Sequence, residues 1–155
     1  MQQARTALVL SGGGARAAYQ VGVLSAVRDL LPDTRINPFP ILCGTSAGAI
    51  NAVSLGVYSE DFGDAVDNLL YIWRNFHAGQ VYRADNLGLA RTGARWLMAL
   101  MFGWAVDRYP KSLLDNTPLR ELLTERLDFS RIQRAIDRGA LYVLSVTASG
   151  YTSGD

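Results

Sequence analysis

Short apolar runs and apolar residues at helical spacing alternate along the chain. The runs at 6–10, 40–43 and 140–146 are rich in β-prone residues and predict three buried strands, the second ending where Gly44 breaks the run. Apolar residues at helical spacing predict helices at 18–31, 46–57, 59–73, 119–127 and 130–138. Because strands and helices alternate, we expect an α/β fold with a mainly parallel sheet.

The second predicted strand leads directly into Gly44-Thr45-Ser46-Ala47-Gly48. This is Gly-x-Ser-x-Gly between a strand and a helix, which is the context of a nucleophile elbow. In such a turn the serine takes a strained backbone conformation and projects its hydroxyl, while side chains at Gly44 and Gly48 would clash with neighbouring backbone. We therefore expect Ser46 to be a nucleophile, beside a helix N-terminus whose partial positive charge favours a developing anion.

A glycine cluster, Gly12-Gly13-Gly14, follows the first predicted strand. Its backbone N–H groups are free of side chains and can converge on an anionic oxygen. The cluster lacks the Gly-x-Gly-x-x-Gly and Gly-Lys-Ser/Thr patterns of phosphate loops, although a phosphate cradle and a simple tight turn stay as alternatives. Adjacent parallel strands end at the same sheet edge, so we interpret these glycines as an oxyanion hole beside Ser46. Arg16 is then expected to steady the loop or a phosphate.

The general base is harder to place, because the sequence contains a single histidine, His77. It lies in a polar connection soon after Ser46, whereas the α/β-hydrolase order puts the catalytic histidine late in the chain. A Ser-His-Asp triad is therefore disfavoured and a carboxylate must serve as the base. An esterase that uses His77 stays as a rival hypothesis.

Composition and charge limit the domain count, the kinds of partner and the compartment that we expect. The 155 residues suit one domain, 49% of them are hydrophobic, and the net charge of +1 gives no reason to expect a nucleic-acid partner. The only cysteine, Cys43, excludes an internal disulfide and is interpreted as a small buried residue. We expect a cytoplasmic protein without a signal peptide, membrane span, metal or cofactor.

One dense apolar and aromatic segment, Trp96 to Trp104, has two interpretations. It is too short for a membrane span and fits an ordinary buried helix. It also fits a lid or a peripheral membrane contact that delivers lipid to Ser46, and Arg91 and Arg95 would then meet lipid phosphates or simply face water.

Three segments carry a resemblance to a known family. The stretch 8–16 (Leu-Val-Leu-Ser-Gly-Gly-Gly-Ala-Arg), with 19–24 (Tyr-Gln-Val-Gly-Val-Leu), resembles the opening of patatin-like phospholipases. The stretch 44–49 (Gly-Thr-Ser-Ala-Gly-Ala) is similar to their nucleophile motif, and 113–119 resembles a segment common in bacterial members. The resemblance covers nearly the whole chain. It implies a three-layer αβα fold and a phospholipase A, lysophospholipase or esterase activity on a lipid or acyl-ester substrate, with a Ser-Asp dyad.

Two departures from the family pattern qualify this resemblance. Ala17 stands where many members have glycine, which is a small change. More importantly, the family's dyad aspartate lies in Asp-Gly-Gly or Asp-Gly-Ala near the C-terminus, and no aspartate here is followed by glycine. Residues 1–155 are therefore expected to be the N-terminal part of a single patatin-like domain that is incomplete at its C-terminus.

This expectation has consequences for activity and association. Without its base and with a sheet edge uncovered, the 155-residue chain alone is expected to be inactive and either weakly stable or oligomeric. The alternative is a non-catalytic patatin-like module that binds lipid or a protein partner. If the chain alone is active, its base is to be sought among the aspartates Asp85, Asp107, Asp115 and Asp155, although Asp115 fits a turn before Thr117-Pro118 better.

Overall fold

The structure is a computed structural model that describes residues 5–75 and 117–148. The chain divides into two units, Met1–Asn75 with Leu127–Asp155 and Phe76–Arg126. The described part of the second unit is one helix, α5 (Thr117–Arg126), which confirms the helix predicted after Asn116. The sheet and the other described helices belong to the first unit.

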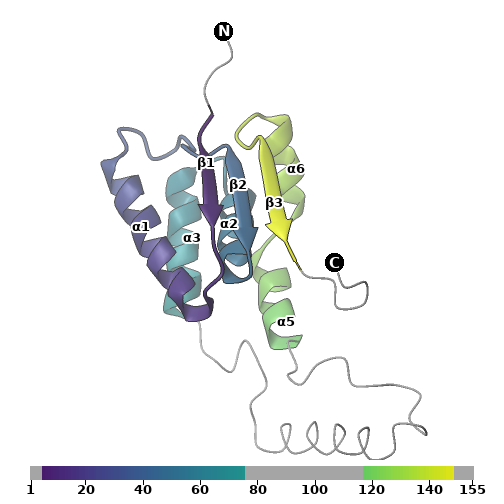
Figure 1. The fold of residues 1–155 in the computed structure, drawn as a ribbon. Helices are drawn as coiled ribbons and strands as arrows, with labels where there is room; N and C mark the ends of the chain where they lie inside the picture. The colour runs from purple at the N-terminus through teal and green to yellow at the C-terminus, as the bar shows by residue number, and fades with distance from the viewer. Residues whose placement is uncertain (1–4, 76–116, 149–155) are drawn as a thin grey trace, which may run out of the picture. The chain divides into compact units, whose positions relative to one another are not determined.

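The first unit contains one parallel sheet of three strands, β1 (Ala7–Leu10), β2 (Ile41–Thr45) and β3 (Val143–Thr147), in the order β1-β2-β3. Leu10 pairs with Gly44, and Gly44 in turn pairs with Val146. The sheet with its connecting helices is consistent with the predicted three-layer α/β fold (Figure 1).

The helices of this unit start and stop close to the positions that the sequence predicts. A short 3-10 turn, η1, runs into α1, and Asp61 caps α3 by accepting a hydrogen bond from the Asp64 backbone N–H at 3.1 Å. Gly139, with φ of 77°, follows the end of α6 in the left-handed conformation that favours glycine. The bounds are η1 Gly14–Arg16, α1 Ala17–Leu30, α2 Ala47–Val57, α3 Phe62–Arg74 and α6 Ser130–Asp137.

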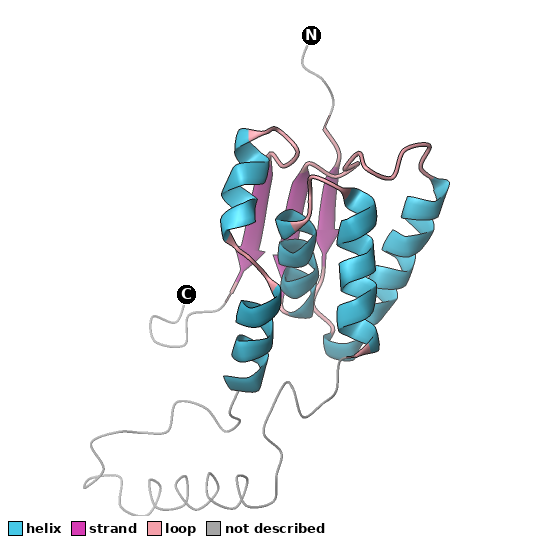
Figure 2. Ribbon diagram, turned by 180° about the vertical axis from the view of Figure 1, so that it is seen from behind, coloured by secondary structure: helices cyan, strands magenta, loops and turns pink. Residues whose placement is uncertain are grey.

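The core lies between the sheet and one layer of helices. Figures 1 and 2 show α2, α3 and α6 on the same face of the sheet. All three helices belong to the connection between β2 and β3, and a right-handed crossover places its helices on one face of the sheet, which explains this arrangement. The buried apolar side chains of this core include Leu10, Leu42, Val21, Leu24, Ala52, Leu55, Phe62, Leu69 and Leu141.

The prediction of three buried strands is wrong for β1 and β3. Val9 is 74% exposed and Val143 is 40% exposed, because alternate strand residues point away from the helical layer. Leu10, on the other face, is only 5% exposed. Among the described residues, the second face of the sheet therefore carries apolar side chains in contact with solvent.

Two strand boundaries also differ from those predicted. β2 continues through Gly44 and Thr45, because both residues are paired with neighbouring strands and this pairing outweighs the weak strand preference of glycine. β3 begins later than residue 140. The backbone N–H groups of Ala140 and Leu141 donate instead to the Ala135 carbonyl at the end of α6, at 3.0 and 3.2 Å.

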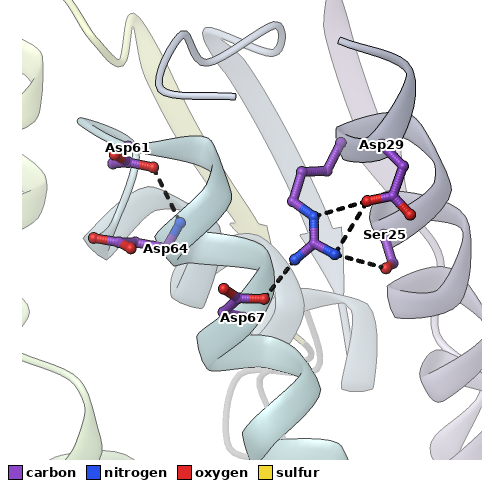
Figure 3. A network of polar contacts seen from close by, with 6 residues as sticks. Ser25, Asp29, Asp61, Asp64 and Asp67 are labelled. Carbon is purple, nitrogen blue, oxygen red and sulfur yellow. Dashed lines mark hydrogen bonds and ion pairs between the residues drawn. The ribbon is translucent and has the colours of Figure 1, made fainter. Parts of the chain in front are cut away.

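A polar contact joins α1 to α3 on the surface of the helical layer (Figure 3). The Arg28 Nη1 donates to Asp67 Oδ1 at 2.5 Å, and Nη2 donates to Asp29 Oδ1 at 3.2 Å. Partial burial works to lower the pKa of the Arg28 guanidinium, but the hydrogen bonds to Asp29 and Asp67 outweigh it and the pKa is raised. Arg28 is therefore a permanently charged link between the two helices.

Candidate active site

Ser46 occupies the turn between β2 and α2, where the sequence predicts a nucleophile. Its φ is 53° and its ψ is −127°, and among the described residues it is the one non-glycine residue with a positive φ. This backbone conformation is strained for an L-residue, and strain of this kind is concentrated at functional sites. Ser46 immediately precedes the first residue of α2, so the partial positive charge of the helix N-terminus lies beside it.

The two glycines of the motif allow close backbone approach around this turn. A Cβ atom at Gly44 would lie 2.6 Å from the Ala49 Cα and 2.6 Å from the Gly48 carbonyl oxygen. A Cβ atom at Gly48 would overlap the Leu10 carbonyl oxygen and lie 2.5 Å from the Ser11 carbonyl oxygen. Gly48 therefore lets the N-terminus of α2 pack directly against the end of β1.

The glycine loop (Gly12, Gly13 and Gly14) lies beside Ser46. A Cβ atom at Gly12 would lie 3.0 Å from the Ser46 Cβ and 3.6 Å from its Oγ. The parallel register explains the proximity, because Leu10 pairs with Gly44 and both strands end at the same edge of the sheet. The backbone of Gly12 is thus close enough to act on the same substrate atom as the serine hydroxyl.

The rest of the loop turns away into α1. Gly14 has a φ of 54°, and a Cβ atom there would meet nothing within 4 Å, so glycine is required for its conformation and not for space. The Arg16 backbone N–H donates to the Gly13 carbonyl at 3.1 Å, which closes the 3-10 turn. The Arg16 side chain is exposed and has no hydrogen-bond or ion-pair partner within the described ranges, so its supporting role stays a prediction.

A buried polar network that the sequence analysis did not identify lies next to the loop. Asn51 on α2 is fully buried, and its Nδ2 donates to the Ala17 carbonyl at 3.1 Å and to Gln20 Oε1 at 3.0 Å. Its Oδ1 accepts a hydrogen bond from Trp73 Nε1 at 2.8 Å. Gln20 Nε2 then donates to the Ser11 carbonyl at 2.8 Å. Gln20, Asn51 and Trp73, which we name the polar network, thus connect α3, α2 and α1 to the glycine loop.

One signal in the sequence pointed to this network. Asn51 is the one side-chain amide in the otherwise mostly apolar helix after Ser46, and a buried polar residue in such a position is normally hydrogen-bonded. Its partners come from α1 and α3, and no local pattern indicates them. Gln20 lies within one of the segments that resemble the patatin-like phospholipases, but nothing in its own neighbourhood marks it.

A general base for Ser46 is not found in the part of the chain that the structure describes. Ser46 Oγ has no hydrogen-bond partner there, and several carboxylates serve other contacts, such as Asp67 with Arg28 and Asp128 with Ser130. The described residues also contain no group of three or more His, Cys, Asp or Glu side chains that could hold a metal ion. The remaining predicted residues lie outside the described ranges: His77, Asp85, Arg91, Arg95, the segment from Trp96 to Trp104, Asp107, Asp115 and Asp155.

Within the same ranges, none of the helices combines the length and the apolar character that crossing a membrane requires. Peripheral membrane contact through the segment from Trp96 to Trp104 stays a prediction, because this segment lies outside the described residues.

The arrangement brings together a serine hydroxyl, a helix N-terminus and a glycine loop at one sheet edge, which are the parts that acyl transfer requires beside a base. Comparison with known proteins agrees with this geometry. The patatin-like phospholipase family model matches residues 8–153, which include Ser46 and the glycine loop. Searches of curated proteins and of solved structures gave no match. Membership of this family supports lipid acyl hydrolase activity in general. The match spans nearly the whole chain, and the protein therefore belongs to the patatin-like phospholipase family.

Proposed function

We propose that the protein hydrolyses carboxylic esters of lipids, with Ser46 as the nucleophile and a Ser-Asp dyad. The observation that carries this proposal is the approach of Gly12 to Ser46, with an added Cβ only 3.0 Å from the Ser46 Cβ. A strained serine at the N-terminus of α2 supports the same function, because its hydroxyl is presented at the edge of the sheet.

In the proposed reaction, the Ser46 Oγ attacks the ester carbonyl carbon while its proton passes to an aspartate outside the described residues. The carbonyl oxygen becomes an oxyanion that accepts hydrogen bonds from backbone N–H groups of the glycine loop. The C–O bond to the alcohol then breaks, and the alcohol leaves with the proton. Water hydrolyses the acyl-serine by the same steps and releases the fatty acid.

The experiment compares the wild-type full-length protein with Ser46→Ala, using p-nitrophenyl butyrate and a phospholipid in mixed micelles. Ser46→Ala should abolish hydrolysis of both and prevent labelling by a fluorophosphonate probe. Ser25→Ala is the matched control, because Ser25 lies on α1 and its hydroxyl makes, among the described residues, a single long hydrogen bond, to Arg28 at 3.4 Å. Unchanged turnover in Ser46→Ala would refute the assignment of the nucleophile.

A second candidate is a non-catalytic module that binds lipid or a protein partner. It is favoured by one observation, the absence of a hydrogen-bond partner for the Ser46 Oγ in the described ranges. The same experiment separates the two functions. A non-catalytic module would leave Ser46 unlabelled and would bind phospholipid vesicles equally well with serine or alanine at this position.

A further inference from the structure

We propose that Gln20 is a positioning residue of the oxyanion hole, which it orients by holding the peptide group between Ser11 and Gly12. This inference rests on the proposed function. It begins from a single hydrogen bond, the one that Gln20 Nε2 donates to the Ser11 carbonyl at 2.8 Å. The carbonyl of Ser11 and the N–H of Gly12 belong to the same planar trans peptide and point in opposite directions. Fixing the direction of the carbonyl therefore fixes the direction of the Gly12 N–H.

The Gly12 N–H matters because of where Gly12 lies. An added Cβ would be 3.0 Å from the Ser46 Cβ, which makes Gly12 the glycine of the loop that lies against the nucleophile. The corresponding atom at Gly13 would meet only the Arg16 Cβ, at 3.4 Å, and that at Gly14 would meet nothing within 4 Å. Gly12 is therefore the loop residue whose N–H orientation has most effect on an oxyanion formed at Ser46.

The orientation of the Gln20 amide is itself determined by its neighbours. The Asn51 Oδ1 accepts from Trp73 Nε1, an indole N–H that can only donate. The Asn51 Nδ2 must then face its two acceptors, the Ala17 carbonyl and Gln20 Oε1. With its oxygen held by Asn51, Gln20 presents its Nε2 to the Ser11 carbonyl. Reversing either amide would place donor against donor or acceptor against acceptor, and Asn51 is fully buried, so water cannot repair the mismatch.

The backbone of α2 also approaches the carbonyl oxygen that Gln20 holds. The Ser11 carbonyl oxygen lies so close to Gly48 that an added Cβ would be 2.5 Å away. The Ser11–Gly12 peptide is thus held by the polar network and by the backbone of the helix that carries Ser46. An oxyanion hole acts through preorganisation, because its donors must already point at the developing charge. Gln20 supplies this preorganisation without touching the substrate.

Two variants of the full-length protein test the hydrogen bond that Gln20 Nε2 donates to the Ser11 carbonyl. Gln20→Glu keeps the shape and the acceptor for Asn51 but replaces the donor to Ser11 with a carboxylate oxygen. Gln20→Met keeps a similar length and removes both hydrogen bonds. A displaced reacting group can cost about a hundredfold in rate, so each variant should lower kcat for p-nitrophenyl butyrate by about tenfold to a hundredfold while KM stays within about twofold.

A matched control separates positioning from stability. Asn68 on α3 donates to the Ser54 Oγ on α2 at 3.1 Å, so Asn68→Leu removes a side-chain amide hydrogen bond from the same helical layer away from the loop. This control should lower the urea midpoint of unfolding with kcat unchanged. The Gln20 variants should lower kcat even at temperatures where they are fully folded.

The outcomes distinguish this inference from the proposed function. If wild-type hydrolysis does not depend on Ser46, the proposed function fails before Gln20 is considered. If it does depend on Ser46 and both Gln20 variants keep kcat within about twofold of wild type, the positioning role is refuted. A rise in KM with unchanged kcat in both variants would also overturn it, because an oxyanion-hole defect acts on the transition state.

Discussion

Replacing Gly48 with alanine should destabilise the protein, whereas the same replacement at Gly22 should stabilise it. Both glycines lie within helices, Gly48 near the start of α2 and Gly22 within α1, so alanine improves helix propensity at both. The two positions differ in the space around them. An added Cβ at Gly22 meets nothing within 4 Å, whereas at Gly48 it overlaps the Leu10 carbonyl and lies 2.5 Å from the Ser11 carbonyl oxygen.

The magnitudes follow from these surroundings. At Gly22 the gain is the propensity difference between alanine and glycine, about 1 kcal/mol in the free energy of unfolding. At Gly48 the obstructing atoms are backbone atoms. A distance of 2.5 Å is too short, because Cβ atoms in proteins essentially never approach another heavy atom closer than 3.0 Å. The end of β1 must therefore shift, and overpacking of this kind costs about 1–3 kcal/mol or more, which exceeds the propensity gain. Because the propensity gain is common to both variants, their stabilities should differ by this overpacking cost, about 1–3 kcal/mol.

Thermal unfolding followed by circular dichroism measures this difference. For a protein of this size 1 kcal/mol corresponds to about 2–4 °C, so the Tm values of the two variants should lie about 2–12 °C apart, with wild type between them. Urea unfolding gives an independent comparison of the midpoints. Equal Tm values for Gly48→Ala and Gly22→Ala would refute the close approach of β1 and α2 that the site depends on.

Three further predictions test other contacts. Gly12→Ala keeps the backbone N–H but places a Cβ 3.0 Å from the nucleophile's Cβ, which must displace that N–H from the oxyanion. Full loss of an oxyanion donor costs on the order of 10²–10³ in rate, so kcat should fall by up to this factor in an ester hydrolysis assay while KM changes little. Asp67→Ala breaks the exposed ion pair with Arg28 and should lower stability by at most about 1 kcal/mol in urea unfolding, with a smaller loss at high salt. Hydrogen bonds from Ser130 lower the pKa of Asp128, so NMR titration should place this carboxyl below its ordinary value of 3.8. The Asp128 contribution to stability is therefore present above that value and is lost as the pH falls through the lowered pKa.

Much of the fold could be predicted because its signals are local. The strand before Ser46, the helix after it and the turn at Gly139 each follow from residues close in sequence. The extension of β2 through Gly44 and Thr45 could not be predicted in this way, since it depends on pairing with two other strands. The exposure of Val9 has a similar cause, because the handedness of the crossovers decides which face of the sheet the described helices cover.

The same distinction applies to the candidate site, where local motifs could be predicted and contacts between distant elements could not. Ser46 and the glycine loop stand in recognisable motifs, and parallel strand order was enough to predict that they lie together. Gln20 and Trp73 could not be predicted, because each is hydrogen-bonded to Asn51, which lies on a helix distant from it in sequence. The absence of an Asp-Gly pattern predicts that the dyad aspartate lies beyond residue 155, and this stays a prediction.

The separation of Gly12 and Ser46 along the chain has a consequence for folding kinetics. The whole of α1 lies between them, and the pairing of β1 with β2 is what makes them neighbours. Helices form from local contacts on a submicrosecond to microsecond timescale, whereas parallel pairing must first close the intervening chain into a loop and is slower. A partly folded chain with α1 and α2 already formed would carry the serine without its oxyanion donors. During refolding, hydrolytic activity should therefore return with the sheet, well after the helical signal has recovered.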